Sequence, residues 1–389
     1  MDWKTLARKI KNLHLLTLLS FINLILFPSK RIREKSILLI RLDAIGDYVL
    51  FRNFIEILKK HPRYSGYRIT LLGNIVWKEL ALELDGAFVD EFIWLDRRSF
   101  AKNFLYRYKK LREICSMGYE TVISPVYSRE FYFSDWIARS VHAKEKIASI
   151  GNYSNISRKQ KKKSDQWFTR LIPAKEAIVF EFYRNREFFS NLLGEELAIA
   201  RPNINLQNTA RPASLPEKYA VLFIGASAKF RKWPAANFAE VARHLQQEFG
   251  LAIVLAGGPS DTSDARDFQA LYHGEVCNMV GKTSLPDLAR LLFNAKILLS
   301  NETSAPHIAT ALGNCQVIVL SNGNHFGRFV PYPESINAKY HVIFHPTIQD
   351  DTETYQKNSN MYGFGSTLDI SDIPLETVIQ CVRRALGAM

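Results

Sequence analysis

The sequence has few cysteines, and they lie far apart. The four are Cys115, Cys277, Cys315 and Cys381 in a chain of 389 residues. They form no C-x-x-C pair, and this spacing fits neither a zinc site nor a disulfide framework. We therefore expect a protein of a reducing cytosol.

Several motifs of nucleotide and metal chemistry are also absent. No G-x-G-x-x-G follows a predicted strand, which disfavours a nicotinamide enzyme, and no G-x-x-x-x-G-K-[ST] loop indicates a phosphate-cleaving ATPase. The D-x-D carboxylate pair, which binds manganese in one class of sugar transferases, is missing too. If the chain is a transferase, we expect it to work without a metal or other cofactor.

No apolar run is long enough to cross a membrane comfortably. The longest, residues 13–27, has about fifteen mainly apolar residues, whereas a span needs roughly twenty. No small-residue cleavage site follows it, so a signal peptide is disfavoured. Lys4, Arg8 and Lys11 precede it on one helical face, which is typical of a helix lying on an anionic membrane. A buried helix of the first domain is the alternative.

The formal net charge of +13 indicates an anionic partner. The excess is concentrated in residues 1–35 and in "SRKQKKK", residues 157–163. Such a charge is typical of proteins that bind nucleic acid, anionic lipid or an anionic substrate. Because no recognised nucleic-acid module appears, we expect no nucleic-acid partner and assign residues 1–35 to a membrane surface.

The order of predicted elements indicates an α/β fold with two domains. Strands at 36–41, 67–73, 91–95 and 119–125 alternate with helices, as do strands from residue 219 onward, which is typical of parallel sheets. Between them, 141–200 looks helical and aromatic-rich, and 201–218 has three prolines and no periodicity. We predict a first domain at 36–200, a linker at 201–218, a second domain at 219–370 and a closing helix at 371–389.

Three loops of the second domain follow strands and precede helices, where ligands bind in such sheets. The first, 225–238, joins small residues to cations, and the second, 300–313, offers hydroxyls and amides at a helix start; both suit phosphate. The third, 256–264, could reach a ribose or base. The alternatives are an exposed basic loop and ordinary helix caps. Together the loops predict a nucleotide diphosphate site. Its candidate residues are Gly225, Ser227, Arg231, Lys232, Gly258, Ser260, Asp261, Thr303, Ser304, Ala305 and His307.

In the first domain, Asp47 follows the first strand in "RLDAIGD". Its simplest interpretation is an N-cap carboxylate, and the same holds for Asp43. If the two sheets face each other across a cleft, however, Asp47 is placed to deprotonate an acceptor hydroxyl.

These motifs, in this order, resemble the bacterial heptosyltransferase family of GT-B glycosyltransferases. The resemblance runs from about residue 36 to 345 and rests on "ILLIRLDAIGDYVL", "GYETVIS", "GASAKFRKWPAANFAEVARHL", "IVLAGGPSD" and "LLSNETSAPHIATALG". It implies a GT-B fold, with two Rossmann-like domains facing each other across a cleft. The first would bind the acceptor and the second the donor.

The resemblance also implies an activity and residue roles. It implies inverting transfer of heptose from ADP-heptose to lipopolysaccharide at the cytoplasmic face of the inner membrane. Asp47 corresponds to the catalytic base, Arg231 to the phosphate-binding lysine, and Glu302, Thr303, Ser304 and His307 to the donor motif D-T-G-x-x-H. Ser304 replaces a glycine and Glu302 an aspartate, so the donor sugar stays open. The loop "SPVYSR" departs from the family's D-L-Q-G, and Arg129 is its candidate acceptor contact.

We therefore predict a peripheral membrane glycosyltransferase that needs no metal. The acceptor would be lipopolysaccharide or a related surface glycan. Alternatives are a transferase that uses another nucleotide sugar in O-antigen or capsule synthesis, a non-catalytic membrane scaffold, and a nucleic-acid-binding protein.

Overall fold

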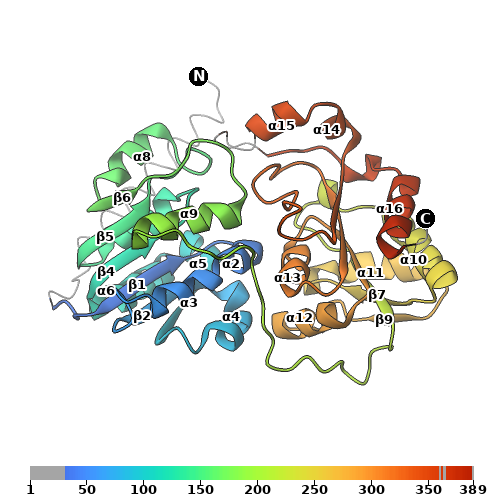
Figure 1. Cartoon of the computed structure of the whole chain (residues 1–389), viewed down its shortest axis with the longest axis horizontal. Helices are drawn as coiled ribbons and strands as arrows, with labels where there is room; N and C mark the ends of the chain where they lie inside the picture. The colour runs from blue at the N-terminus through green and yellow to red at the C-terminus, as the bar shows by residue number, and fades with distance from the viewer. Residues whose placement is uncertain (1–30, 359–360, 362–364, 388–389) are drawn as a thin grey trace.

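The computed structural model describes residues 31–358, 361 and 365–387, which form two α/β domains side by side (Figure 1). The predicted membrane-binding segment, residues 1–35, lies almost wholly outside the described residues. No helix in the described part of the chain is long and apolar enough to cross a membrane.

The first domain contains a six-stranded parallel sheet in the order β3-β2-β1-β4-β5-β6. The central strand β1 is buried along its whole length, as expected for a strand with helices on both faces. The strands are β1 (Ser36–Arg41), β2 (Arg68–Asn74), β3 (Glu91–Leu95), β4 (Tyr119–Ser124), β5 (Ala143–Ser149) and β6 (Arg170–Ile172). The α-helices are α2 (Ile45–Phe51), α3 (Asn53–Lys60), α4 (Lys78–Asp85), α5 (Arg97–Lys102), α6 (Phe104–Met117), α7 (Trp136–Ser140), α8 (Arg158–Asp165) and α9 (Glu181–Leu193).

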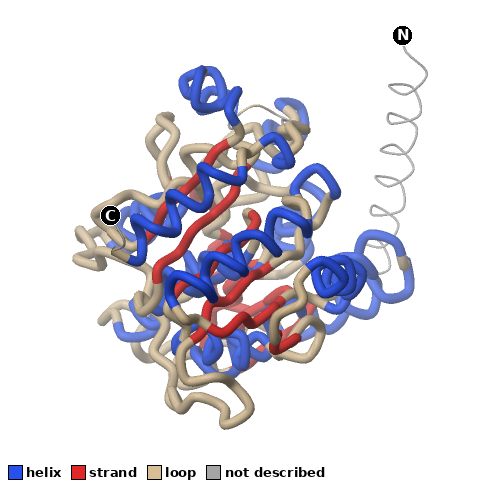
Figure 2. The backbone as a smooth tube through the Cα atoms, turned by 90° about the vertical axis from the view of Figure 1, so that its right-hand side faces the viewer, coloured by secondary structure: helices blue, strands red, loops and turns tan. Residues whose placement is uncertain are grey.

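The second domain repeats this plan with the order β12-β11-β10-β7-β8-β9, again all parallel. Its strands are β7 (Tyr219–Phe223), β8 (Ala252–Ala256), β9 (Val276–Asn278), β10 (Ile297–Asn301), β11 (Gln316–Ser321) and β12 (Tyr340–Phe344). Its α-helices are α10 (Ala235–Phe249), α11 (Thr262–Leu271), α12 (Leu285–Asn294), α13 (Ser304–Leu312), α14 (Pro346–Asp350), α15 (Thr352–Asn358) and α16 (Leu375–Leu386). Figure 2 shows helices lying over the strands.

Two local expectations need correction. The stretch 141–200, which looks helical, contains strands β5 and β6, because pairing with β4 overrides the helix preference of "AKEKIAS". Proline is common at the first helical position, so the sequence predicts that Pro234 begins a helix, but it precedes α10 at the N-cap. Glycine is common at helix ends, so the sequence also predicts a C-cap at Gly194; this is confirmed, since its φ of 81° is left-handed and its N–H donates to Ser190 O.

An apolar interface holds the two domains together. Helices α2 and α4 of the first domain contact α13 and α12 of the second, and one buried cluster runs through both. Arg290 on α12 adds an ion pair with Glu83 on α4, in which Nη2 lies 2.7 and 2.8 Å from the two carboxylate oxygens. The carboxyl ends of β1, β7 and β10 therefore lead into loops at this interface.

A buried polar group links α2 to the linker. Asp85 is fully buried and accepts hydrogen bonds from Arg52 Nη2 at 2.7 Å and Tyr48 Oη at 2.5 Å. The other Arg52 terminus donates to Asn203 O at 2.6 Å. Because removal of one member leaves the others buried without a partner, this group is a strong constraint on the position of α2.

We expect Asp85→Ala to lower the free energy of unfolding by about 3–5 kcal/mol, since it strands the Arg52 charge in the interior. Urea denaturation measures the loss. Glu56→Ala, which removes only the exposed pair with Lys60 on α3, is the control and should cost less than about 0.5 kcal/mol. Similar losses in the two variants would contradict a structural role for the buried group.

Candidate active site

Asp47 lies in the first turn of α2, directly after β1. The N-cap of this helix is Ala44, which offers no side-chain cap, so the simplest interpretation of Asp47 as an N-cap is not what the structure shows. Its carboxylate is 22% exposed and forms no hydrogen bond within the described chain. It is therefore free to accept a proton from a ligand.

Gly46 allows the two domains to approach each other beside this carboxylate. A Cβ added at Gly46 would lie 2.6 Å from His307 Cδ2 and 3.0 Å from Nε2. Real Cβ atoms do not come this close, so only glycine permits the imidazole to lie on α2. His307 is on α13, and its Nδ1 lies 2.8 Å from Tyr332 Oη. Burial lowers the pKa of His307 to about 4, so the ring is a neutral packing surface at pH 7.

Arg41, at the end of β1, sits beneath the carboxylates of the first domain. The side chain is fully buried, and Nη2 lies 3.1 Å from Asp43 Oδ2, 3.6 Å from Glu181 Oε1 and 3.8 Å from Asp47 Oδ1. One guanidinium thus forms ion-pair contacts with three carboxylates. Burial, followed by repulsion from Asp43, raises the pKa of Asp47 to about 8 even though Arg41 opposes the shift.

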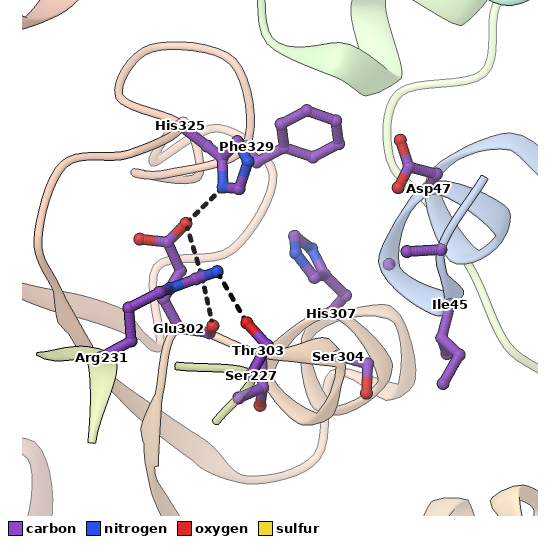
Figure 3. Close-up of a pocket in the computed structure, with 12 residues that line it drawn as sticks. Ile45, Asp47, Ser227, Arg231, Glu302, Thr303, Ser304, His307, His325 and Phe329 are labelled. Atoms are coloured by element: carbon purple, nitrogen blue, oxygen red, sulfur yellow. Dashed lines mark hydrogen bonds and ion pairs between the residues drawn. The ribbon is translucent and has the colours of Figure 1, made fainter. Parts of the chain in front are cut away.

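Arg231 faces Asp47 from the second domain. Its Nη2 donates to the backbone oxygen of Glu302 at 2.8 Å and lies 3.5 Å from Glu302 Oε1. Its Nη1 donates to Ser227 Oγ at 3.3 Å. Arg231 Nε is buried and has no partner among the described residues. These contacts hold the guanidinium at the wall of a cavity that Asp47 and His307 also line (Figure 3).

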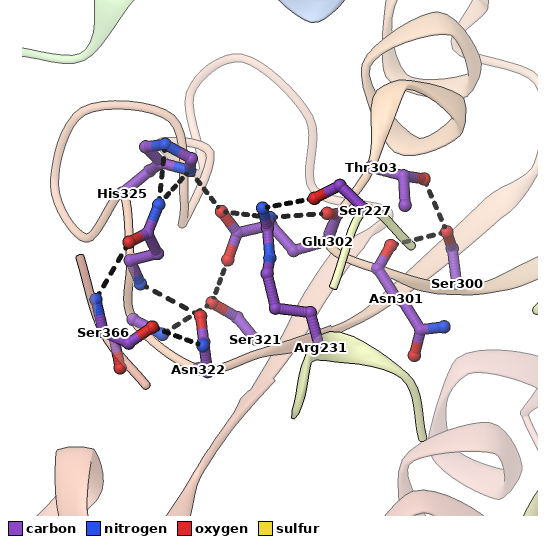
Figure 4. A network of polar contacts seen from close by, with 12 residues as sticks. Ser227, Arg231, Ser300, Asn301, Glu302, Thr303, Ser321, Asn322, His325 and Ser366 are labelled. Atoms are coloured by element: carbon purple, nitrogen blue, oxygen red, sulfur yellow. Dashed lines mark hydrogen bonds and ion pairs between the residues drawn. The ribbon is translucent and has the colours of Figure 1, made fainter. Parts of the chain in front are cut away.

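Glu302 is the centre of a polar network at the end of β10 (Figure 4). His325 Nδ1 lies 2.7 Å from Glu302 Oε1, and Ser321 Oγ donates to Oε2. Burial alone would raise the pKa of Glu302, but the hydrogen bond and charge of His325 together with Arg231 lower it to about 2. A fixed negative charge therefore stands beside Arg231.

The N-terminus of α13 opens into the same cavity. Thr303 is the N-cap but makes no side-chain cap, since its Oγ1 lies 3.2 Å from Ser300 Oγ. Ser304 begins the helix, and Ala305 is buried behind it. Uncapped amides at a helix N-terminus favour an anion.

Two cavities meet at Asp47. One, lined mostly by the second domain, has a volume of about 360 Å³, and the other, lined mostly by the first domain, has about 530 Å³. We label them the donor-side and acceptor-side cavities after the sequence predictions for the two domains. Ala44, Asp47, His325 and Phe329 line both. The donor-side cavity is completed by Ile45, Gly46, Ser227, Arg231, Glu302, Thr303, Ser304 and His307. The acceptor-side cavity is completed by Asp43, Asn74, Val76, Arg97, Val126, Ser128, Glu130, Ser154, Asn155, Glu181, Asn324, Arg328 and Met361.

Several predicted donor residues lie outside both cavities. Lys232 turns away from Arg231 and pairs with Asp264 at 2.5 Å and Asp261 at 3.3 Å. Asp261 also accepts from Gly258 N–H at 2.9 Å and packs on Gly225, where no Cβ would fit. Ser260 is exposed beside it. These residues brace the loops after β7 and β8.

Arg129, the candidate acceptor contact, lies in the interior. The guanidinium is fully buried, where it pairs with Asp135 at 2.8 Å and Asp165 at 2.6 Å. Ser164 Oγ and Ser149 O accept further hydrogen bonds. With its donors satisfied, Arg129 is placed to hold the domain together rather than to contact a ligand.

The sequence interpretation missed the loop that follows β11. This loop carries Asn324, His325, Arg328 and Phe329 into the cleft. Arg328 reaches across to the first domain, where it donates to Ser128 Oγ at 2.7 Å and lies 3.5 Å from Glu181 Oε2. The signal was present, because the loop follows a predicted parallel strand as the other candidate loops do. Arg97 had the same signal, because it follows the predicted strand at 91–95, whereas Glu181 had none.

The described residues contain no group of three or more His, Cys, Asp or Glu side chains placed to hold a metal ion. Arg231 and the amides at the start of α13 line the donor-side cavity and could neutralise a diphosphate.

Known structures with the same fold include sugar transferases. A glycosyl transferase family 9 protein from Veillonella parvula aligns with a TM-score of 0.68 and 18% identity, over 92% of this chain and 99% of that one. The Escherichia coli heptosyltransferase WaaC with ADP aligns with a TM-score of 0.64 and 17% identity, over 90% of this chain and 99% of that one. E. coli ADP-heptose lps heptosyltransferase II aligns with a TM-score of 0.63 and 20% identity, over 91% of this chain and 99% of that one. These likenesses confirm the predicted GT-B fold.

The sequence itself matches a family over residues 112–357, which is more than half of the chain. The search of curated proteins gave no significant match. The matched family is described as glycosyltransferase family 9 (heptosyltransferase). The chain therefore belongs to this family and is a glycosyltransferase.

Proposed function

We propose that the protein transfers heptose from ADP-heptose to a sugar hydroxyl of lipopolysaccharide or a related surface glycan. The observation that carries this proposal is the position of Asp47 in the wall shared by the two cavities. One cavity offers a cation and a helix N-terminus to a diphosphate, and the other offers polar side chains to a sugar. Two substrates that bind there would meet at one carboxylate. The neighbouring structures described with ADP or as ADP-heptose enzymes support the choice of donor.

In the proposed reaction the acceptor hydroxyl gives its proton to Asp47. Its oxygen attacks the anomeric carbon from the face opposite the diphosphate, and the bond from that carbon to the phosphate oxygen breaks. The configuration inverts. The leaving diphosphate gains negative charge, which Arg231 and the amides of Thr303 to Ala305 stabilise more strongly than in the ground state. No metal is needed in this scheme.

We further propose that the enzyme works on the cytoplasmic face of the inner membrane as a peripheral protein. The proposal rests on the net charge of +13 and on the basic residues 1–35. Helix α8 adds exposed cations at Arg158, Lys159, Lys162 and Lys163. Anionic lipid attracts such segments by about 1 kcal/mol per cation near the surface.

Asp47→Ala should abolish transfer, with kcat reduced by about 10²–10⁴, because the acceptor proton loses its base. ADP binding, measured by calorimetry, should stay within about twofold of the wild type, since Asp47 makes no contact that holds the donor loops. A parallel loss of ADP binding would contradict the assignment of Asp47 as base.

The pH profile of kcat/KM should report the raised pKa of Asp47. A base must be deprotonated, so activity should fall about tenfold per pH unit below about 8. Asp43→Asn removes the like charge that raises this pKa and should move the ascending limb to lower pH. A limb that stays in place or moves upward would rule out Asp47 as the titrating group.

Arg231→Ala should weaken ADP binding and lower kcat, because the side chain lines the donor-side cavity. Lys232→Ala is the matched neighbour, and its effect should be several times smaller because Asp261 and Asp264 already neutralise it. Calorimetry with ADP and steady-state kinetics test both variants. A larger effect for Lys232 would show that the loop rearranges to bring that lysine onto the diphosphate.

A further inference from the structure

The acceptor-side cavity has more acids than cations. Four carboxylates line it, from Asp43, Asp47, Glu130 and Glu181, whereas its arginines are Arg97 and Arg328. Arg41 supplies a third positive charge, but it is fully buried behind Asp43 and cannot touch a ligand. Even with Asp47 protonated at neutral pH, the remaining three carboxylates match the three arginines, so the cavity has no excess of positive charge to offer an acceptor.

Both arginines of the cavity are already paired. Arg97 forms a bidentate pair with Glu130, with both N–O distances at 2.7 Å, and donates to Leu42 O at 3.0 Å. Arg328 donates to Ser128 Oγ at 2.7 Å and lies 3.5 Å from Glu181 Oε2. An anionic ligand would have to displace a carboxylate from one of them and leave that carboxylate unpaired in the same cavity. Charge pairs of this bidentate kind are the strong ones.

Glu181 supplies an independent indication of what the cavity accepts. Its side chain is 4% exposed, and Oε2 is buried with only the ion-pair contact to Arg328 at 3.5 Å and no hydrogen bond among the described residues. A buried carboxylate oxygen without a donor is costly, and ligand binding can satisfy it. Only a hydrogen-bond donor can do so, such as a sugar hydroxyl or an ammonium group. An ionised carboxylate or a fully ionised phosphate has no proton to donate, and its negative charge is repelled by Glu181.

We infer that the acceptor is a neutral sugar or an amino sugar, without phosphate or carboxylate where it contacts this cavity, and that Glu130 and Glu181 determine this specificity. The inference rests on the proposed function, because it takes the cavity as the acceptor site. Glu181 would bind the acceptor directly, whereas Glu130 acts by neutralising Arg97. In each case the glutamate pairs with an arginine that could otherwise bind an anionic sugar.

The test uses matched sugars on the full chain with the donor site filled by ADP. Mannose, mannosamine and mannose 6-phosphate are titrated by NMR, and ADP binding is measured separately by calorimetry. We expect the wild type to bind mannose or mannosamine at least ten times more tightly than the phosphate. Equal or tighter binding of mannose 6-phosphate would overturn the inference.

Glu181→Gln and Glu130→Gln each release one arginine. Each should strengthen binding of mannose 6-phosphate and so reduce the affinity ratio of mannose or mannosamine to mannose 6-phosphate at least threefold. Glu248→Gln is the control, since it breaks a bidentate pair with Arg383 elsewhere on the second domain, and it should leave the preference unchanged. An unchanged preference in both cavity variants, with ADP binding intact, would overturn the inference. If no sugar binds while ADP does, the cavity is not the acceptor site and the inference falls, but the donor half of the proposed function stands. If ADP does not bind to the wild-type protein, the proposal that ADP-heptose is the donor is refuted instead.

Discussion

The contact between Gly46 and His307 holds the first turn of α2 against α13, and the geometry of the site depends on it. Each helix begins at the carboxyl end of a central strand, β1 in one sheet and β10 in the other. Contact between two such helix starts brings two ligand-binding edges together. The glycine of "AIGD" is thus required by the approach of the two domains. The aspartate after it lies beside the opposite sheet for the same reason.

A single buried cation organises the acids on the first-domain side. Arg41 is at the end of β1 and within 4 Å of Asp43, Asp47 and Glu181. Burial and repulsion from Asp43 raise the pKa of Asp47 to about 8, and Arg41, which is shared among three carboxylates, offsets this shift only in part. A carboxylate with a raised pKa is a stronger base once deprotonated. Across the cleft, Glu302 has the opposite environment, where His325 and Arg231 hold its pKa at about 2. Two buried acids in one cleft thus differ in proton affinity because of their neighbours.

The sequence predicted much of this arrangement through one rule, that loops at the carboxyl ends of parallel strands gather at one edge. The rule places Asp47, Arg231, Thr303 and His307 together, and the structure does bring them together. It fails for Lys232 because neighbouring residues can point in different directions. The short 3₁₀ turn Lys229–Arg231 ends there, and Lys232 is extended. Its partner Asp264 lies on α11, a contact that no local pattern reveals.

Other parts of the site depend on long-range contacts that a single sequence does not contain. Arg129 looks like a ligand contact in "SPVYSR", but Asp135 and Asp165 come from elements that fold back over it. Glu181 begins α9, far along the chain from β1, and becomes part of the site because Arg41 and Arg328 both reach it. Motifs therefore predict the backbone positions of a site better than its charge balance. That balance is set by partners distant in sequence. In this cleft the distant partners are carboxylates, so the cations of the site face acids: Arg231 lies beside Glu302, and Arg97 and Arg328 lie beside Glu130 and Glu181.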